Sequence, residues 1–263
     1  MKRRLIDLLA PIGLILLLLA AWQAAADWDV LSDLLGIEPF LIPSPTDVAT
    51  ALADNFSLLA DNAWVTMREV LLGFAVALAI GIAFALLLHL WPLLRRAFYP
   101  IIIASQTVPV IVVAPILIVW FGFGIGPKVA IVALICFFPI TVNMLDGLGS
   151  VDPKQHKLLR SMGAGRAQIL TRLEIPASMP YLVSGAKIAI AVAVIGAVFG
   201  EWAGSDEGLG HLMLIDNAQL EVPRLFAAIF VLSLMATALF GLVAVLERSF
   251  GWWRRDPSHG ATS

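Results

Sequence analysis

Long stretches with few or no charged side chains constrain the fold of this sequence more than any other feature. A lipid-bilayer core about 30 Å thick is crossed by about 20 mostly apolar residues in an α-helix. Six such stretches occur, at residues 8–26, 70–94, 97–127, 129–145, 182–203 and 225–246. Their apolar residues do not alternate with polar ones, as they do in barrel strands. The sequence therefore predicts an all-α, polytopic membrane protein with six transmembrane helices.

The composition excludes several other classes of protein. Hydrophobic residues make up 60% of the chain and charged residues 14%, whereas soluble domains carry about 25% charged residues. A soluble enzyme, a nucleic-acid-binding protein and a disordered chain are therefore excluded. The single cysteine, Cys136, rules out a disulfide framework. Because no residues are spaced like metal ligands or a catalytic triad, we expect no catalytic, cofactor-binding or metal-binding residue in this chain.

The distribution of Lys and Arg predicts the orientation in the membrane. With a cytoplasmic N-terminus, 13 of the 17 basic residues fall in cytoplasmic segments, as the positive-inside rule requires. Both termini are therefore expected in the cytoplasm. The first apolar stretch, at 19 residues, is longer than the 7–15 residues usual in a cleaved signal peptide. This length favours a retained membrane anchor over a signal peptide.

Four segments follow one another along the chain. They are an N-terminal helix with its tail (1–27), an outer segment (28–67), a transmembrane core (68–248) and a cytoplasmic tail (249–263). In the outer segment, a proline turn precedes an amphipathic helix from Thr46, which we expect to lie on the membrane surface. The helix carries its apolar residues on one face, namely Val48, Leu52, Phe56 and Leu59. The outer loop 204–223 is half apolar and is expected to dip into the membrane interface.

The third apolar stretch carries Pro100, Pro109 and Pro115 and is expected to be one kinked helix. A kink frees backbone carbonyl groups, which then need a neighbouring group or a water-filled cavity. The stretch is therefore a candidate for the wall of a translocation pathway, and a packing kink is the alternative.

Polar groups at membrane depth are costly and often functional. The pathway candidates are accordingly Gln106, Thr107, Pro109, Asn143 and Glu201. For Gln106 and Asn143 the alternative is a hydrogen bond between helices, and for Glu201 it is a position at the membrane interface. His89 lies in the last turn of the second predicted span. It is expected to interact with the helix end or to snorkel to the interface.

The cytoplasmic segment 146–182 is longer than the few residues that usually connect two helices. Asp152-Pro153 predicts the start of a helix that runs to Met162. Gly163 to Gly165 should break that helix, and a second short helix should run from Arg166 to Leu173. Pro176 and Pro180 are expected to end it and lead the chain back to the membrane. Such a segment is typical of a docking surface for another protein.

The spacing in this segment resembles the EAA loop of bacterial ABC importer permeases. That loop begins with the triplet Glu-Ala-Ala, which is followed after three residues by a glycine. Nine residues further on comes a run of four: an apolar residue, any residue, an apolar residue and a proline. Gly163 and the run Leu173-Glu174-Ile175-Pro176 match this spacing, while the triplet reads Lys157-Leu158-Leu159 in place of Glu-Ala-Ala. Other stretches within residues 40–250, such as Leu41–Pro45 and Gly208-Leu209-Gly210, are similar to permeases for nitrate, sulfonates, taurine and vitamin precursors such as hydroxymethylpyrimidine.

The resemblance implies a type I importer permease in the bacterial cytoplasmic (inner) membrane. It implies pairing with a second permease, expected to be a second copy of this chain. An ATPase dimer would bind the 146–182 loop and hold ATP and Mg, and a substrate-binding protein would deliver the solute from outside. No Gly-x-x-x-x-Gly-Lys-Ser/Thr phosphate loop occurs in this chain, in agreement with a separate ATPase. The residues that the resemblance assigns to coupling are Gly163, Ala164, Gly165, Arg166, Ala167, Ile169 and Pro176, with Ile169 filling a pocket on the ATPase.

Other kinds of transport protein fit the sequence less well. A secondary transporter, which is the alternative function, needs paired carboxylates at mid-depth or two similar halves, and neither is visible. A channel needs a charged ring or a filter sequence. No Lys or Arg lies at mid-depth of a predicted span, so a bare inorganic anion is disfavoured as the solute. We expect a small organic solute, either a heterocyclic vitamin precursor or a sulfonate.

Overall fold

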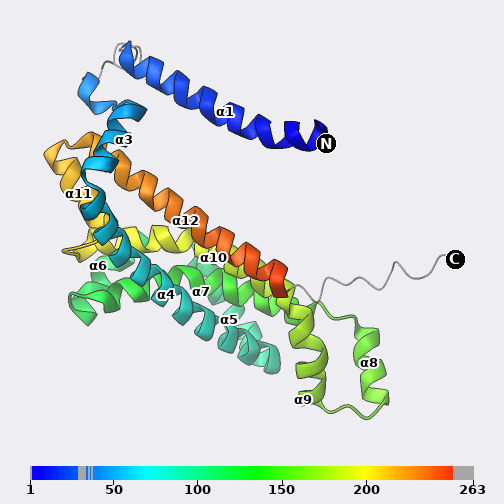
Figure 1. The fold of residues 1–263 in the computed structure, drawn as a ribbon. Coiled ribbons are helices and arrows are strands. Elements are labelled where there is room, and N and C mark those ends of the chain that lie inside the picture. Colours follow the sequence, from blue (N-terminus) through cyan, green and yellow to red (C-terminus); the bar gives the residue numbers. More distant parts are fainter. Residues whose placement is uncertain (1, 29–33, 35, 37, 251–263) are drawn as a thin grey trace. The chain divides into compact units, whose positions relative to one another are not determined.

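Helices form every regular element in the part of the chain that the computed structural model describes, residues 2–28, 34, 36 and 38–250 (Figure 1). The elements are α1 (Lys2–Asp27), η1 (Pro39–Leu41), α3 (Pro45–Asp54), α4 (Phe56–Leu90), α5 (Pro92–Ser105), α6 (Val110–Phe121), α7 (Ile125–Gly149), α8 (Pro153–Ser161), α9 (Arg166–Ile169), η2 (Leu170–Glu174), α10 (Ile175–Gly204), α11 (Leu209–Gln219) and α12 (Val222–Phe250). The predicted all-α class is confirmed. Residues 251–263 of the predicted cytoplasmic tail lie outside the described residues.

The described residues form two compact units. The first contains the residues up to Trp64 together with Glu207–Ser233, and the second contains Val65–Asp206 together with the residues from Leu234 on. The candidate site lies entirely in the second unit.

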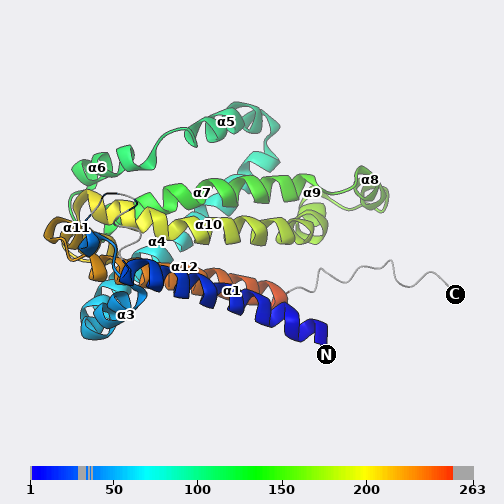
Figure 2. The same cartoon turned by 90° about the horizontal axis from the view of Figure 1, so that it is seen from above.

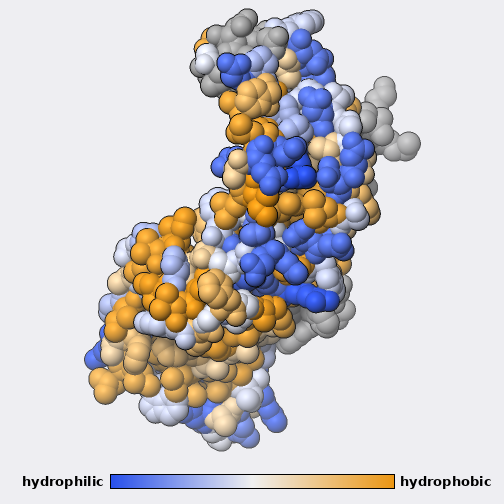
Figure 3. All heavy atoms as spheres, turned by 90° about the vertical axis from the view of Figure 1, so that its left-hand side faces the viewer, coloured by the Kyte–Doolittle hydropathy of each residue, from blue (hydrophilic) through white to orange (hydrophobic). Residues whose placement is uncertain are grey.

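Four continuous helices of the described chain are long and apolar enough to cross a membrane. They are α4, α7, the run Arg166–Gly204 and α12, with mean hydropathies of 2.1 to 2.8. The pair α5 and α6 adds a fifth if it is counted as one broken span. The apolar part of α1, Gly13–Asp27, is shorter than these helices. The number of six spanning helices therefore stays a prediction, and so does the location of both termini in the cytoplasm. Broad apolar areas, drawn in orange in Figure 3, are typical of a surface that meets lipid.

The third apolar stretch is broken rather than kinked. The axes of α5 and α6 differ by 103°, with a break between Ser105 and Val110. Pro109 is extended, with φ −65° and ψ 117°, and a proline also disfavours helical geometry in the residue before it. Pro100 and Pro115, by contrast, lie inside their helices. Figure 2 shows α6 and then α5 along one side of α7.

The core of the second unit includes the pair α7 and α10, which pack closely against each other. Glycines permit this close approach. A Cβ on Gly185 would lie 2.5 Å from the Pro139 carbonyl oxygen, and a Cβ on Gly147 would lie 2.8 Å from the Ser178 Cα. Small residues at such contacts let membrane helices pack backbone against backbone, so α7 and α10 form a closely fitted pair.

The helix expected from Thr46 ends earlier than the sequence suggested. Its start is confirmed by a capping box, in which the Asp47 N–H donates to Ser44 Oγ and the Ser44 N–H donates to the Asp47 carboxylate. The helix α3 stops at Asp54, and Phe56 already belongs to α4. The prediction that one amphipathic helix carries both Val48 and Phe56 is therefore wrong, because the chain changes direction at Asn55, whose ψ is 24°.

The outer loop 204–223 contains a helix, α11, that the sequence did not predict. Its end is marked by Leu220 in the left-handed conformation, with φ 59°. Just beyond it, the Arg224 guanidinium pairs with the fully buried Asp216 carboxylate at 2.6 Å. This ion pair fastens α11 to the start of α12.

Candidate functional site

The cytoplasmic segment folds as the predicted helix, glycine turn and helix. Asp152 caps α8 by accepting a hydrogen bond from the Lys154 N–H at 2.8 Å. The turn that follows depends on Gly163, whose φ is +83°. A side chain there would meet no neighbour, so the glycine is needed for its backbone conformation rather than for space. The second helix, α9, begins at Arg166 as expected.

The second helix does not end where the prolines were expected to end it. The helix α9 passes through a π-helical turn, η2, directly into α10, so that one helical run extends from Arg166 to Gly204. Pro176 lies in the first turn of α10. A π turn adds one residue to the helix, and this extra residue lets the chain pass a proline that has no N–H to donate. The loop therefore continues into a membrane helix without a non-helical break, although the run turns between α9 and α10 (Figure 1).

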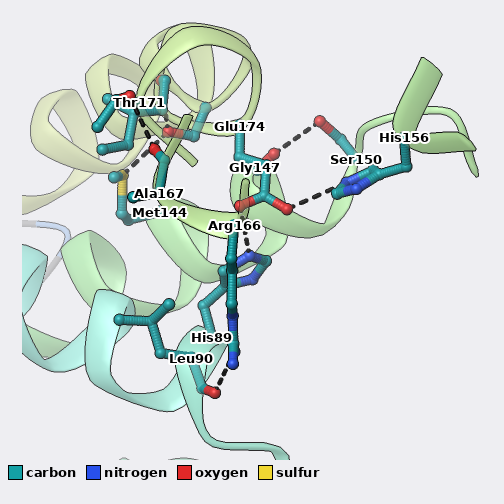
Figure 4. Close-up of polar contacts among 12 residues, drawn as sticks. His89, Leu90, Met144, Gly147, Ser150, His156, Arg166, Ala167, Thr171 and Glu174 are labelled. Atoms are coloured by element: carbon teal, nitrogen blue, oxygen red, sulfur yellow. Dashed lines mark hydrogen bonds and ion pairs between the residues drawn. The ribbon is translucent and has the colours of Figure 1, made fainter. Parts of the chain in front are cut away.

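Glu174 connects three parts of the structure (Figure 4). Its Oε2 lies 3.0 Å from His89 Nε2 at the end of α4, and its Oε1 lies 3.0 Å from His156 Nε2 on α8. The Glu174 residue is only 8% exposed. We call Glu174, His89 and His156 the Glu174 clamp. Because the carboxylate accepts a hydrogen bond from His89 on one oxygen and pairs with His156 through the other, it holds both α4 and α8 against η2.

Two further contacts lie at helix ends around the segment (Figure 4). The guanidinium of Arg166 donates to the Leu90 carbonyl oxygen, at the C-terminal end of α4. Ser150 Oγ donates to the Gly147 carbonyl at 2.7 Å and closes the end of α7. Basic groups at helix C-termini satisfy the last carbonyl groups, which have no partner within the helix. The end of α4 is thus held by both His89 and Arg166.

The coupling residues differ in how far a partner protein can reach them. Gly163, Gly165, Arg166 and Ala167 are exposed, and Ala164 and Pro176 are half-buried. Ile169 is 4% exposed, so the prediction that it fills a pocket on a partner is wrong: the helical register turns it toward the chain's own interior. Beside the turn lies a cavity of about 290 Å³ whose lining residues are Leu159, Met162, Gly163, Ala164, Gln168 and Arg172.

The five pathway candidates fall into two groups. Gln106, Thr107 and Pro109 lie together at the break between α5 and α6. The Asn143 amide instead donates to the Pro139 carbonyl at 2.8 Å, inside the contact between α7 and α10. Glu201 is 1% exposed and accepts a hydrogen bond from Thr66 Oγ1 at 2.6 Å. The structure therefore brings the first three candidates together and places the last two within the helix packing.

A buried polar cluster joins α4, α7 and α10. Lys128 Nζ lies 3.0 Å from a carboxylate oxygen of Glu69 and also donates to Ser205 Oγ. The Glu201 carboxyl, bound to Thr66, interacts with Glu69. Buried charges are tolerated when they are paired in this way, so the cluster ties the interior of α4 to the start of α7 and the end of α10. The signal that sequence reasoning missed was opposite charges, Glu69 and Lys128, at the ends of neighbouring apolar stretches.

Comparison with known proteins decides the family. Residues 75–252 match the family model described as "Binding-protein-dependent transport system inner membrane component". The chain belongs to this family. It is 39% identical, over 87% of its length and 91% of the relative, to the formylaminopyrimidine transport permease protein of Halalkalibacterium halodurans. It is 35% identical, over 91% of its length and 88% of the relative, to the riboflavin transport system permease protein of Chloroflexus aurantiacus. The suspected family is confirmed, and the chain is an ABC importer permease for small solutes.

Solved structures agree on the fold. The methionine ABC transporter MetNI in an inward-facing conformation matches 74% of this chain and 97% of its own, with a TM-score of 0.66 and 18% identity. An amino acid ABC transporter with histidines matches 76% of this chain and 97% of its own, with a TM-score of 0.61 and 16% identity. The fold is that of type I ABC importer permeases, and the chain is a multi-pass membrane protein.

Proposed function

We propose that this chain forms, with a second copy, the pathway by which an ATP-driven importer of the bacterial cytoplasmic membrane takes up a pyrimidine-type vitamin precursor. A substrate-binding protein would deliver the solute to the outer segments, around residues 42–62 and 204–223. An ATPase dimer would bind the 146–182 loop and hold ATP and Mg.

The observation that carries the coupling part of the proposal is the unbroken helical run from Arg166 to Gly204. A movement of an ATPase against the exposed residues Gly165 to Ala167 would reach the membrane through one continuous helical run. The Glu174 clamp ties that helix to α8 and α4. The loop would then move as one body with the membrane helices. The exposed basic residues Arg160, Arg166 and Arg172 suit an acidic rim on the ATPase.

The substrate part rests on two independent supports. The relative with 39% identity is named for formylaminopyrimidine transport, while a relative named for taurine transport, from Escherichia coli, is 27% identical. The predicted spans also carry no Lys or Arg at mid-depth that would pair with a bare inorganic anion.

Reconstitution tests the proposal. The chain is purified with the ATPase and the binding protein encoded beside it and inserted into proteoliposomes, and uptake of radiolabelled formylaminopyrimidine is measured with and without ATP. ATP-dependent uptake that requires the binding protein is expected. Uptake driven by an ion gradient without ATP would contradict the proposal and favour a secondary transporter. ATP-dependent uptake of taurine but not of the pyrimidine would overturn the substrate class alone.

A further inference from the structure

A small cavity lies at the break between α5 and α6, against α7. Its volume is about 220 Å³, and its walls include Gln106 and Val113 from the broken span and Leu134, Ile135 and Phe137 from α7. The break divides the span into arms of 14 and 12 residues, so the cavity lies near the middle of this segment. It is separate from the coupling loop and from the buried cluster around Lys128.

The chemistry of the lining is selective. None of the residues that line the cavity is charged. A charged solute placed there would lose its hydration without gaining a counter-charge, which is costly. The cavity is smaller than the roughly 300–1,000 Å³ typical of sites for drug-sized ligands. The cavity therefore suits a neutral molecule of about one ring.

Gln106 and Phe137 give the cavity a polar edge and an aromatic wall. The Gln106 side chain is exposed, and its amide makes no hydrogen bond within the described part of the chain, so its donors and its acceptor are available. The Phe137 ring is held by a tilted contact with Phe84, with ring centroids 5.6 Å apart. A planar heterocycle presents both an apolar face, which packs on an aromatic ring, and an edge that hydrogen-bonds to an amide.

We infer that this cavity is a subsite of the translocation pathway that takes a neutral, planar, single-ring heterocycle, with its face on Phe137 and its polar edge on Gln106. The inference rests on the proposed function and names the residues that recognise the solute inside the membrane. It also separates Gln106 from Asn143 and Glu201, whose polar groups are already engaged within the helix packing.

Transport by variants of the complete importer tests the inference. Gln106→Leu removes the hydrogen-bonding groups, and Val113→Phe fills the cavity while leaving Gln106 in place. For each variant we expect uptake of formylaminopyrimidine to fall by about tenfold, the loss that follows from one hydrogen bond or a comparable contact. ATPase stimulation by the loaded binding protein should persist, because the coupling loop is unchanged. Phe240→Leu, at a half-exposed position on α12, is the matched control and should transport normally.

Cysteine labelling supplies a readout that does not depend on transport. The single native cysteine, Cys136, is buried, so Val108→Cys, at an exposed position of the cavity lining that leaves Gln106 in place, introduces one accessible thiol. Formylaminopyrimidine at saturating concentration should slow maleimide labelling of this thiol, and taurine should not. If the wild-type importer takes up formylaminopyrimidine and both cavity variants take it up equally well, the subsite is overturned and the proposed function stands. The same conclusion follows if the pyrimidine does not slow the labelling. A wild-type importer that moves no pyrimidine would instead refute the proposed substrate itself.

Discussion

Replacing Glu174 with alanine tests whether the clamp transmits movement from the loop to the membrane helices. The substitution removes a carboxylate whose two oxygens each lie 3.0 Å from an imidazole nitrogen, from a residue that is 8% exposed. A hydrogen bond to a charged group contributes about 1.5–3 kcal/mol. Because the His89 and His156 side chains are 17% and 32% exposed and water can reach both imidazoles, the total cost should be about 3 kcal/mol.

The expected consequence is uncoupling rather than unfolding. The packing of α7 on α10 does not involve the clamp, so the permease should still insert and bind its ATPase. Without the clamp, η2 is no longer held to α8 and to the end of α4. In proteoliposomes, uptake should fall by more than tenfold, because a factor of ten corresponds to only about 1.4 kcal/mol, which is less than the interaction energy lost. Basal ATP hydrolysis should remain.

Two further variants make the test specific. In Glu174→Gln the amide oxygen still accepts from one imidazole and the amide nitrogen donates to the other in its alternative tautomer, so this variant should retain more uptake than Glu174→Ala. Gln155→Ala, at an exposed position of α8 next to His156, should behave as wild type. Wild-type uptake in Glu174→Ala, or loss of the assembled complex in place of a loss of coupling, would refute this reasoning.

Three other predictions concern the backbone and the buried charges. Gly163→Val should fold and insert but lower uptake and substrate-stimulated ATPase activity together, because a φ of +83° strains a β-branched residue by about 1–3 kcal/mol; wild-type transport would refute a role for the turn. Gly185→Val should reduce the yield of folded protein in size-exclusion chromatography, since its Cβ would lie 2.5 Å from a carbonyl oxygen. Gly241→Ala is the control and should leave the yield unchanged, because a Cβ at this position would meet no atom within 4 Å. Lys128→Met should destabilise the detergent-solubilised protein by about 3–5 kcal/mol through the unpaired carboxylate that it leaves, and adding Glu69→Gln should restore part of the loss in thermal unfolding.

The features that local chemistry controls could be predicted from the sequence. The lengths of the apolar stretches indicated membrane helices, because a bilayer requires a set number of apolar residues in each span. Asp152 and Gly163 located the start of α8 and the turn after it, because a helix cap and a left-handed glycine depend on the residue itself and its near neighbours. The spacing from Gly163 to Pro176 was enough to suggest the family.

Only the tertiary structure decided which side chains meet. His89 and Glu174 lie 85 residues apart in the sequence, and no local pattern pairs them, because their contact depends on how α4 packs beside η2. Ile169 was expected to face a partner, but the register of the run that continues into α10 turns it inward. Glu201 is placed inside the helix packing for the same reason. Hydropathy determines that a segment enters the membrane, whereas the direction of each side chain is set by the rotation of its helix against its neighbours, which appears only when the helices are assembled.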